Sequence, residues 1–249
     1  MKIAVRHRMI GTIPLLEVVE QAAVYEKRPL IIYYHGWQTQ KELVLTQGRK
    51  LAQAGFRVVL PDAFNHGERK NPVSTIPSLT FWQSIQTNLF EFSLIVDFFA
   101  RLELVADWIG VGGVSMGGMT TCGLLTQHPE ISAAACVMGS PAFLDYRAAL
   151  EKNLANIGRQ VPADYHALTS WIEAYDLASH YAQLPKRPLF FWHGKEDEKI
   201  PFAQVADFVA EFQNEAITFQ IAEERHLVKG ATMTAVTEFF SEAYQKSLR

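Results

Sequence analysis

The feature that most constrains the fold of this chain is the stretch Gly113–Gly117, which reads GVSMG and has Ser115 at its centre. An apolar run at 108–112 precedes it, and the residues that follow have the character of a helix start. A tight turn between a strand and a helix leaves room only for small neighbours of the serine, and Gly113 and Gly117 meet that need. The pattern therefore predicts a strand, a sharp turn and a helix, with the Ser115 hydroxyl held out beyond the C-terminal edge of a sheet.

Composition limits the class of protein. With 249 residues, 49% of them hydrophobic, the chain can bury one core, so we expect a single domain over 1–249. The net charge is −3 and the Lys and Arg residues are dispersed, which argues against a nucleic-acid or membrane partner. The start of the chain has no signal-like apolar region, and no apolar run reaches the roughly 18–20 residues of a membrane span. We therefore expect a soluble, cytoplasmic protein, in which Cys122 and Cys136 are buried thiols rather than a disulfide.

Short apolar runs alternate with longer amphipathic ones along the chain. This alternation is typical of parallel strands covered by helices on both faces, so we predict an α/β fold with a mostly parallel, eight-stranded sheet. The expected strands cover about 1–10, 14–23, 30–34, 56–60, 109–114, 133–138, 189–192 and 217–221. The expected helices cover about 42–54, 81–102, 118–125, 202–213 and 231–247.

One long segment interrupts the alternation. About fifty residues separate the strands that end at Met138 and begin at Leu189, and most of them have helical character. A structureless loop of that length is uncommon in a compact domain. We therefore predict that 142–183 forms a small helical cap, inserted in the same domain and lying over the site.

The surroundings of Ser115 are expected to supply a base and an acid. A serine hydroxyl becomes nucleophilic when a histidine takes its proton and a carboxylate orients that histidine. Asp197 follows the predicted strand 189–192, and His226 lies between the last strand and the terminal helix, so the chain order is Ser, Asp, His. His66 is the alternative base, but it precedes the serine in the chain. We therefore predict a catalytic triad of Ser115, Asp197 and His226.

A carbonyl group attacked by the serine also needs hydrogen-bond donors for the negative charge that develops on its oxygen. The backbone N–H of Met116 lies at the start of the helix after the serine, where unpaired donors and the helix dipole favour an anion. His35-Gly36-Trp37 follows another buried strand, and its glycine permits close approach of the backbone. We predict that the N–H groups of Trp37 and Met116 form the oxyanion hole, and that His35 itself is structural, as is His193 before Gly194.

With these motifs in order, the chain resembles the α/β-hydrolase superfamily over nearly its whole length. It looks closest to small bacterial carboxylesterases of the dienelactone-hydrolase and prolyl-oligopeptidase-like group. The matching motifs are His35-Gly36-Trp37, Pro61-Asp62-Ala63 with His66-Gly67 and Arg69, Gly113–Gly117, His193-Gly194 with Asp197 and Pro201, and Arg225-His226. Two departures stand out: the nucleophile is Ser115 where dienelactone hydrolases use cysteine, and 222–225 lacks a glycine that relatives often carry before the catalytic histidine.

The resemblance implies an α/β-hydrolase fold and a serine carboxylesterase that hydrolyses short-to-medium acyl esters through an acyl-enzyme intermediate. It implies a small-molecule ester substrate, no cofactor and no metal, and the protein could be a monomer or a small homo-oligomer. It also implies that Asp62 and His66 order the loop beside the oxyanion hole. Arg69 is then a partner for Asp62 or for a substrate carboxylate.

Aromatic residues of the loops and the cap are candidates for the substrate pocket. We expect at least half of them to be core packing, and we assign substrate binding to Phe64, Phe143 and Trp171. The wider set is Trp37, Phe64, Phe81, Trp82, Phe143, Tyr146, Tyr165, Trp171 and Tyr175. Two alternatives stay open: a thioesterase or small peptidase with the same triad, and a non-catalytic binding protein that has kept the fold.

Overall fold

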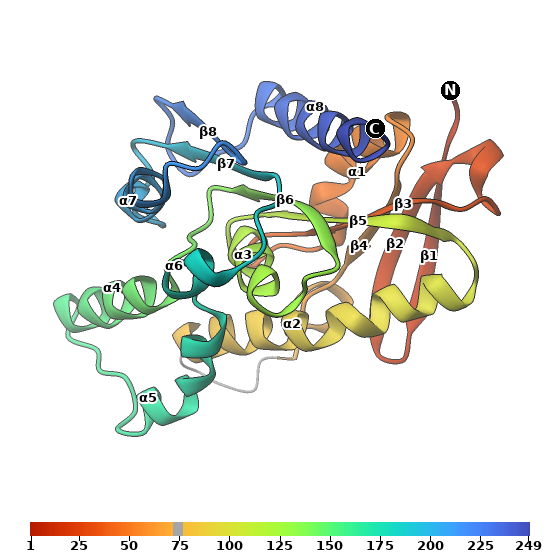
Figure 1. Cartoon of the computed structure of the whole chain (residues 1–249). Coiled ribbons are helices and arrows are strands. Elements are labelled where there is room, and N and C mark those ends of the chain that lie inside the picture. The colour runs from red at the N-terminus through yellow and green to blue at the C-terminus, as the bar shows by residue number, and fades with distance from the viewer. Residues whose placement is uncertain (72–76) are drawn as a thin grey trace.

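The centre of the molecule is an eight-stranded sheet, seen in Figure 1. The computed structural model describes residues 1–71 and 77–249. The strand order is β1-β2-β4-β3-β5-β6-β7-β8; β2 runs antiparallel to β1 and β4, and the pairs from β4 to β8 are parallel. The strands are β1 Ile3–Ile10, β2 Ile13–Glu20, β3 Arg28–Tyr34, β4 Arg57–Pro61, β5 Val105–Val114, β6 Ile131–Val137, β7 Leu189–Gly194 and β8 Ile217–Ala222. This confirms the predicted mostly parallel α/β fold.

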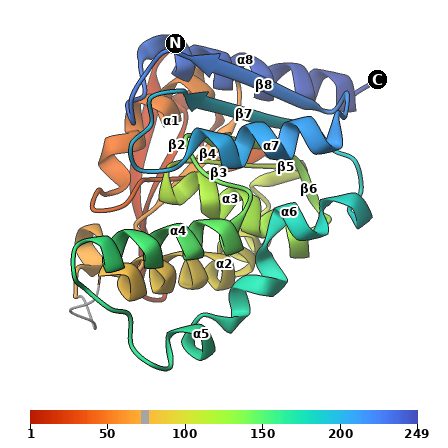
Figure 2. The same cartoon turned by 90° about the vertical axis from the view of Figure 1, so that its left-hand side faces the viewer.

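Helices cover both faces of the sheet (Figures 1 and 2). On one face, α1 (Leu45–Gln53) and α8 (Gly230–Ser247) pack over a cluster that includes Leu51 and Phe240. On the other, α2 (Pro77–Arg101), α3 (Met116–Gln127) and α7 (Phe202–Phe212) pack over a second cluster, which includes Phe92, Met119 and Phe208. The strands between them are almost entirely apolar because they are buried on both faces.

The predicted cap segment forms a series of short helices between β6 and β7. They are α4 (Phe143–Asn156), α5 (Tyr165–Leu168), η4 (Ser170–Tyr175), α6 (Leu177–His180) and η5 (Tyr181–Gln183). The buried carboxylate of Asp176 joins two of them: it accepts the N–H groups of Phe143 at 2.5 Å and of Leu144 at 3.3 Å, and that of Ser179 at 3.1 Å. The Asp176 side chain therefore accepts backbone N–H groups at the N-terminal ends of both α4 and α6, which have no partner within their own helices.

The element expected at 42–54 differs from the prediction at its start. It begins as a 3₁₀ turn, η2 (Lys41–Val44), and continues as α1. Lys41 is anchored from outside the helix, because its backbone N–H lies 2.9 Å and its Nζ 2.7 Å from the carboxylate of Asp62. Gly55, at φ +99°, ends the helix as predicted.

Two other sequence expectations can be compared with the structure. Cys122 and Cys136 are free and buried, as predicted. Within the described ranges, no helix has the length and apolar character that crossing a membrane requires.

Candidate active site

Ser115 lies in the sharp turn between β5 and α3. Its backbone has φ 56° and ψ −116°, a conformation that residues other than glycine rarely adopt. The turn depends on the two glycines, because a side chain at either position would clash with the backbone. A Cβ on Gly113 would lie 2.4 Å from the carbonyl carbon of Gly117, and a Cβ on Gly117 would lie 2.3 Å from the backbone carbonyl oxygen of Tyr34. The structure therefore contains the turn that the sequence pattern indicated, with Ser115 9% exposed.

The three predicted triad residues come together at the carboxyl ends of the strands. The Nε2 atom of His226 is 2.9 Å from Ser115 Oγ, and its Nδ1 atom is 2.7 Å from Asp197 Oδ2. Because Asp197 can only accept at Nδ1 when ionised, the ring carries its proton there and presents Nε2 as the acceptor for the serine hydroxyl. The arrangement can remove a proton from Ser115 and hold it on His226.

The carboxylate of Asp197 is fully buried and held by several donors. Its Oδ1 accepts the N–H groups of Lys199 and Ile200, both at 2.9 Å, while His193 Nε2 lies 3.2 Å from Oδ2. Burial raises the pKa of Asp197, but the hydrogen bonds from His193, His226 and the two amides outweigh it and hold the pKa well below its ordinary range. Asp197 is therefore ionised at neutral pH.

The loop that carries His226 does not need a glycine at 222–225, where relatives often carry one before the catalytic histidine. No residue from 222 to 226, all of which the structure describes, has a positive φ. The glycine that matters is on the neighbouring strand: a Cβ on Gly194 would lie 2.2 Å from the carbonyl oxygen of Glu224. Close packing of this loop against β7 brings His226 to Asp197.

The two residues predicted to supply the oxyanion donors lie near Ser115: Met116 follows it in the chain, and Trp37 lines the same pocket. Met116 is the first residue of α3, so its N–H has no partner within the helix. On the other side, a Cβ on Gly36 would lie 3.5 Å from the Ser115 Cβ, which shows how closely the loop before Trp37 approaches the nucleophile. The Trp37 ring is fixed by edge contacts with His66 and Phe81, with ring centroids at 4.8 and 5.5 Å.

His66, the alternative base, has a structural position. It is 4% exposed, its Nδ1 lies 2.9 Å from the Phe64 carbonyl oxygen, and burial lowers its pKa. Arg69 is a partner of Asp62, as one of the two alternatives expected: its guanidinium donates to the Asp62 backbone carbonyl oxygen at 3.2 Å, and it also binds the Glu91 carboxylate on α2 at 2.6 and 2.8 Å. The Asp62 carboxylate is instead the partner of Lys41 described above.

A pocket of about 200 Å³ opens at Ser115. Its lining is mostly apolar and consists of Trp37, Ser78, Phe81, Ser115, Tyr146, Leu150, Leu154, Lys199 and Ile200. Three of these residues come from one face of the cap helix α4, where they recur every fourth position. That spacing was visible in the sequence and is the signal that could have identified them.

The three residues assigned to substrate binding do not line this pocket. Phe143 is fully buried and packs against Trp82, with ring centroids 5.8 Å apart. Trp171 also packs against Trp82, at 6.1 Å, and the guanidinium carbon of Arg69 lies 5.6 Å from the centre of the Phe64 ring. The pocket beside Ser115 gives no support to the assignment of Phe64, Phe143 and Trp171.

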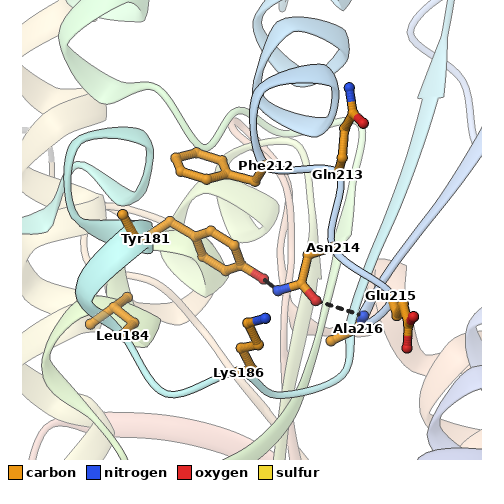
Figure 3. Close-up of a pocket in the computed structure, with 9 residues that line it drawn as sticks. Tyr181, Leu184, Lys186, Phe212, Gln213, Asn214, Glu215 and Ala216 are labelled. Carbon is orange, nitrogen blue, oxygen red and sulfur yellow. Dashed lines mark hydrogen bonds between the residues drawn. The ribbon is translucent and has the colours of Figure 1, made fainter.

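A larger pocket, of about 580 Å³, lies between η5 and the turn from α7 to β8 (Figure 3). Asn214 spans it, with Nδ2 donating to the Tyr181 hydroxyl and Oδ1 accepting the Ala216 N–H, both at 3.0 Å. No predicted site residue lines it. In the described part of the chain, no three His, Cys, Asp or Glu residues are grouped to hold a metal ion.

Comparison with known proteins shows the family to which the chain belongs. The model of the prolyl oligopeptidase family matches residues 86–245, a span that contains all three triad residues. Among curated proteins, YitV of Bacillus subtilis (strain 168) is 33% identical over 215 residues, 83% of each chain. Esterase YjfP of Escherichia coli (strain K12) is 30% identical over 200 residues, 80% of each chain.

Solved structures share the fold at low sequence identity. TT1662 from Thermus thermophilus has a TM-score of 0.75 at 16% identity, covering 98% of each chain. Est1E from Butyrivibrio proteoclasticus, solved with ferulic acid, has a TM-score of 0.70 at 17% identity, covering 96% of this chain and 99% of that one. The family match spans more than half of the chain, and the curated relatives cover most of it. The chain therefore belongs to the prolyl oligopeptidase family of serine hydrolases, with the α/β-hydrolase fold.

Proposed function

We propose that this protein is a carboxylesterase that cleaves short-to-medium acyl esters of small molecules through an acyl-enzyme intermediate. The observation that carries the proposal is the unbroken series of contacts from Asp197 through His226 to Ser115, ending at a small apolar pocket. The esterase name of the relative YjfP supports the same reaction.

In the first step, Ser115 Oγ attacks the ester carbonyl carbon while His226 Nε2 takes the hydroxyl proton. Asp197 keeps the ring in the required tautomer and stabilises its charged form. The N–H groups of Trp37 and Met116 bind the oxygen as it gains charge, an interaction worth about 3–4 kcal/mol for one donor in related chemistry. His226 then protonates the leaving alcohol, and in the second step it activates a water that releases the acid.

The size of the pocket limits the acyl group. A dry cavity of about 150 Å³ holds a benzene molecule, so a pocket of about 200 Å³ holds a butyryl group but not a long fatty chain. Apolar walls favour an uncharged, compact group. We therefore infer a preference for acetyl to medium-length acyl groups, with α4 of the cap forming one wall.

The test is a panel of p-nitrophenyl acetate, butyrate and palmitate, assayed with the native chain and with Ser115→Ala. We expect turnover of the two short esters, little of the palmitate, and none by the variant, whose thermal unfolding stays close to that of the native chain. A fluorophosphonate probe should label the peptide that contains Ser115. Retained turnover in Ser115→Ala contradicts the proposal.

A second candidate is hydrolysis of peptides, favoured by the name of the matching family. The same triad can cleave esters, thioesters and amides, so the triad cannot decide between them. Butyryl ester, butyryl thioester and butyryl amide with matched leaving groups separate these reactions. A kcat/KM that is highest for the amide identifies a peptidase instead.

A further inference from the structure

His193, near the end of β7, is a buried histidine in contact with the catalytic acid. Its side chain is fully buried, and its Nε2 lies 3.2 Å from Asp197 Oδ2 and 3.0 Å from the Ile200 carbonyl oxygen. Both neighbours of Nε2 are acceptors, so this nitrogen carries the ring proton. The other ring nitrogen, Nδ1, is buried and has no hydrogen-bond partner among the described residues.

The contact is made to the same oxygen that His226 uses. Asp197 Oδ2 accepts from His226 Nδ1 at 2.7 Å on one side and faces His193 Nε2 on the other. Oδ1 is held separately, by the backbone N–H groups of Lys199 and Ile200. The carboxylate therefore cannot rotate without breaking bonds at both oxygens, and Oδ2 stays directed at His226.

We propose that His193 is a positioning residue of the triad, which fixes Asp197 and draws negative charge from the oxygen that pairs with His226. The inference rests on the proposed function, because it concerns the same reaction. A second donor on Oδ2 weakens the attraction between Asp197 and the charged His226 ring that forms when Ser115 loses its proton. His226 then releases that proton to the leaving alcohol more readily, and it does so at a pH where the His226 ring of the free enzyme is still mostly unprotonated and can act as the base.

His193 also connects the acid to the pocket wall. Its Nε2 proton is shared with the carbonyl of Ile200, a residue that lines the pocket beside Ser115. A purely structural role would use this second contact alone: loss of His193 would then loosen the loop and lower the amount of folded protein. It would leave the pH dependence of each intact active site unchanged.

The pH dependence therefore distinguishes the two roles. Among the described residues, His193 on β7 and His226 before α8 contact the Asp197 carboxylate, and Tyr146 on α4 and the adjacent Glu198 interact with its charge. Of these, only His193 is altered in the test. The matched pair of variants is His193→Gln, whose amide N–H can reach the Nε2 position, and His193→Asn, whose shorter side chain cannot.

Active sites are counted with the fluorophosphonate probe, and kcat/KM for p-nitrophenyl butyrate is measured from pH 5 to 9. For His193→Asn we expect kcat/KM per active site to fall by about 10- to 100-fold, the usual effect of losing a partner that orients a functional side chain. The acid limb of the pH profile of kcat/KM for this variant should also move to higher pH. His193→Gln should recover most of the activity and the original acid limb, and His7→Asn, on the edge strand β1, is the control substitution.

Two results would overturn the proposal. One is a His193→Asn variant with the wild-type acid limb and wild-type kcat/KM per active site. The other needs no variant: in the native protein, the ¹⁵N signal of His193 Nε2 should shift across the acid limb, and a constant signal contradicts the coupling. Activity that survives in Ser115→Ala would instead refute the proposed function, so the two failures are distinguishable.

Discussion

At the scale of single residues, His35 is a neutral link between two loops of the site. Its Nδ1 lies 2.8 Å from the Gly36 carbonyl oxygen, and its Nε2 lies 3.0 Å from the Ala63 N–H, which it must accept. The Nδ1 proton is therefore the only one the ring carries. Burial lowers the pKa of His35 to about 4, against 6.5 for an exposed histidine.

This shift makes stability depend on pH. Between about pH 6.5 and 4 the unfolded chain binds a proton at His35 that the folded chain does not, so the free energy of unfolding falls as the pH is lowered through this range, by up to about 1.4 kcal/mol per pH unit. His35→Gln keeps an acceptor for Ala63 but does not titrate. We expect it to be less stable at pH 7 and to lose less stability on acidification, measured by urea unfolding at several pH values. Equal slopes for the two proteins would contradict this assignment.

The meeting of Ser115, Asp197 and His226 could be predicted from the sequence because each of the three residues has a local signature. Ser115 lies between glycines, and Asp197 and His226 each follow an apolar strand in the required order. The contact between His193 and Asp197 has no such signature, since a histidine before a glycine at a strand end also fits ordinary packing. It becomes visible only when the loop after β7 folds back onto the strand.

At the scale of elements, the cap helix α4 was predictable but its orientation was not. Phe143 and Tyr146 are both aromatic and lie within one turn of each other, so the sequence does not tell which of them faces the pocket. Their orientation depends on Asp176, 33 residues after Phe143, which holds the start of α4. Such long-range anchoring is absent from local patterns, and for that reason the sequence did not show that Tyr146, and not Phe143, lines the pocket at Ser115.

The orientation of α4 predicts how acyl-chain selectivity can be changed. Leu150 is half-buried and lines the pocket, so Leu150→Trp should narrow the pocket without a large loss of stability. Each buried methylene contributes about 0.8 kcal/mol, so the two that distinguish butyryl from acetyl are worth roughly 15-fold in kcat/KM. We expect Leu150→Trp to remove most of that preference in steady-state assays of the two esters.

Lys152→Trp is the matched control for this experiment. Lys152 is exposed on the same helix and does not line the pocket. Its substitution adds the same indole ring to α4 and should leave the butyrate-to-acetate ratio unchanged. If both tryptophan variants gave the same ratio, α4 would not form a wall of the acyl site.

At the scale of the whole molecule, the antiparallel β1–β2 hairpin joins the parallel sheet through a buried charge. Glu17 on β2 is fully buried and pairs with Arg57 on β4, which is also fully buried, and with Arg8 at 2.8 Å. Arg57 also donates to carbonyl oxygens of Ala23, Val24, Glu26 and Leu104. The sequence shows a glutamate inside an apolar strand but not its partner, because the pairing depends on β2 lying beside β4 rather than β3.

Removing one charge of this pair should weaken the whole fold without changing the chemistry of the site. Glu17→Gln keeps the shape of the side chain but leaves the Arg57 guanidinium buried without an anion, which costs about 3–5 kcal/mol. The exposed pair Lys195–Glu223 supplies the comparison: Glu223→Gln should cost less than about 1 kcal/mol. Urea unfolding measures the loss of stability in both variants. When active sites are counted with the fluorophosphonate probe, both variants should have the wild-type kcat/KM per active site. A Glu17→Gln protein as stable as Glu223→Gln would mean that apolar packing alone holds the hairpin to the sheet.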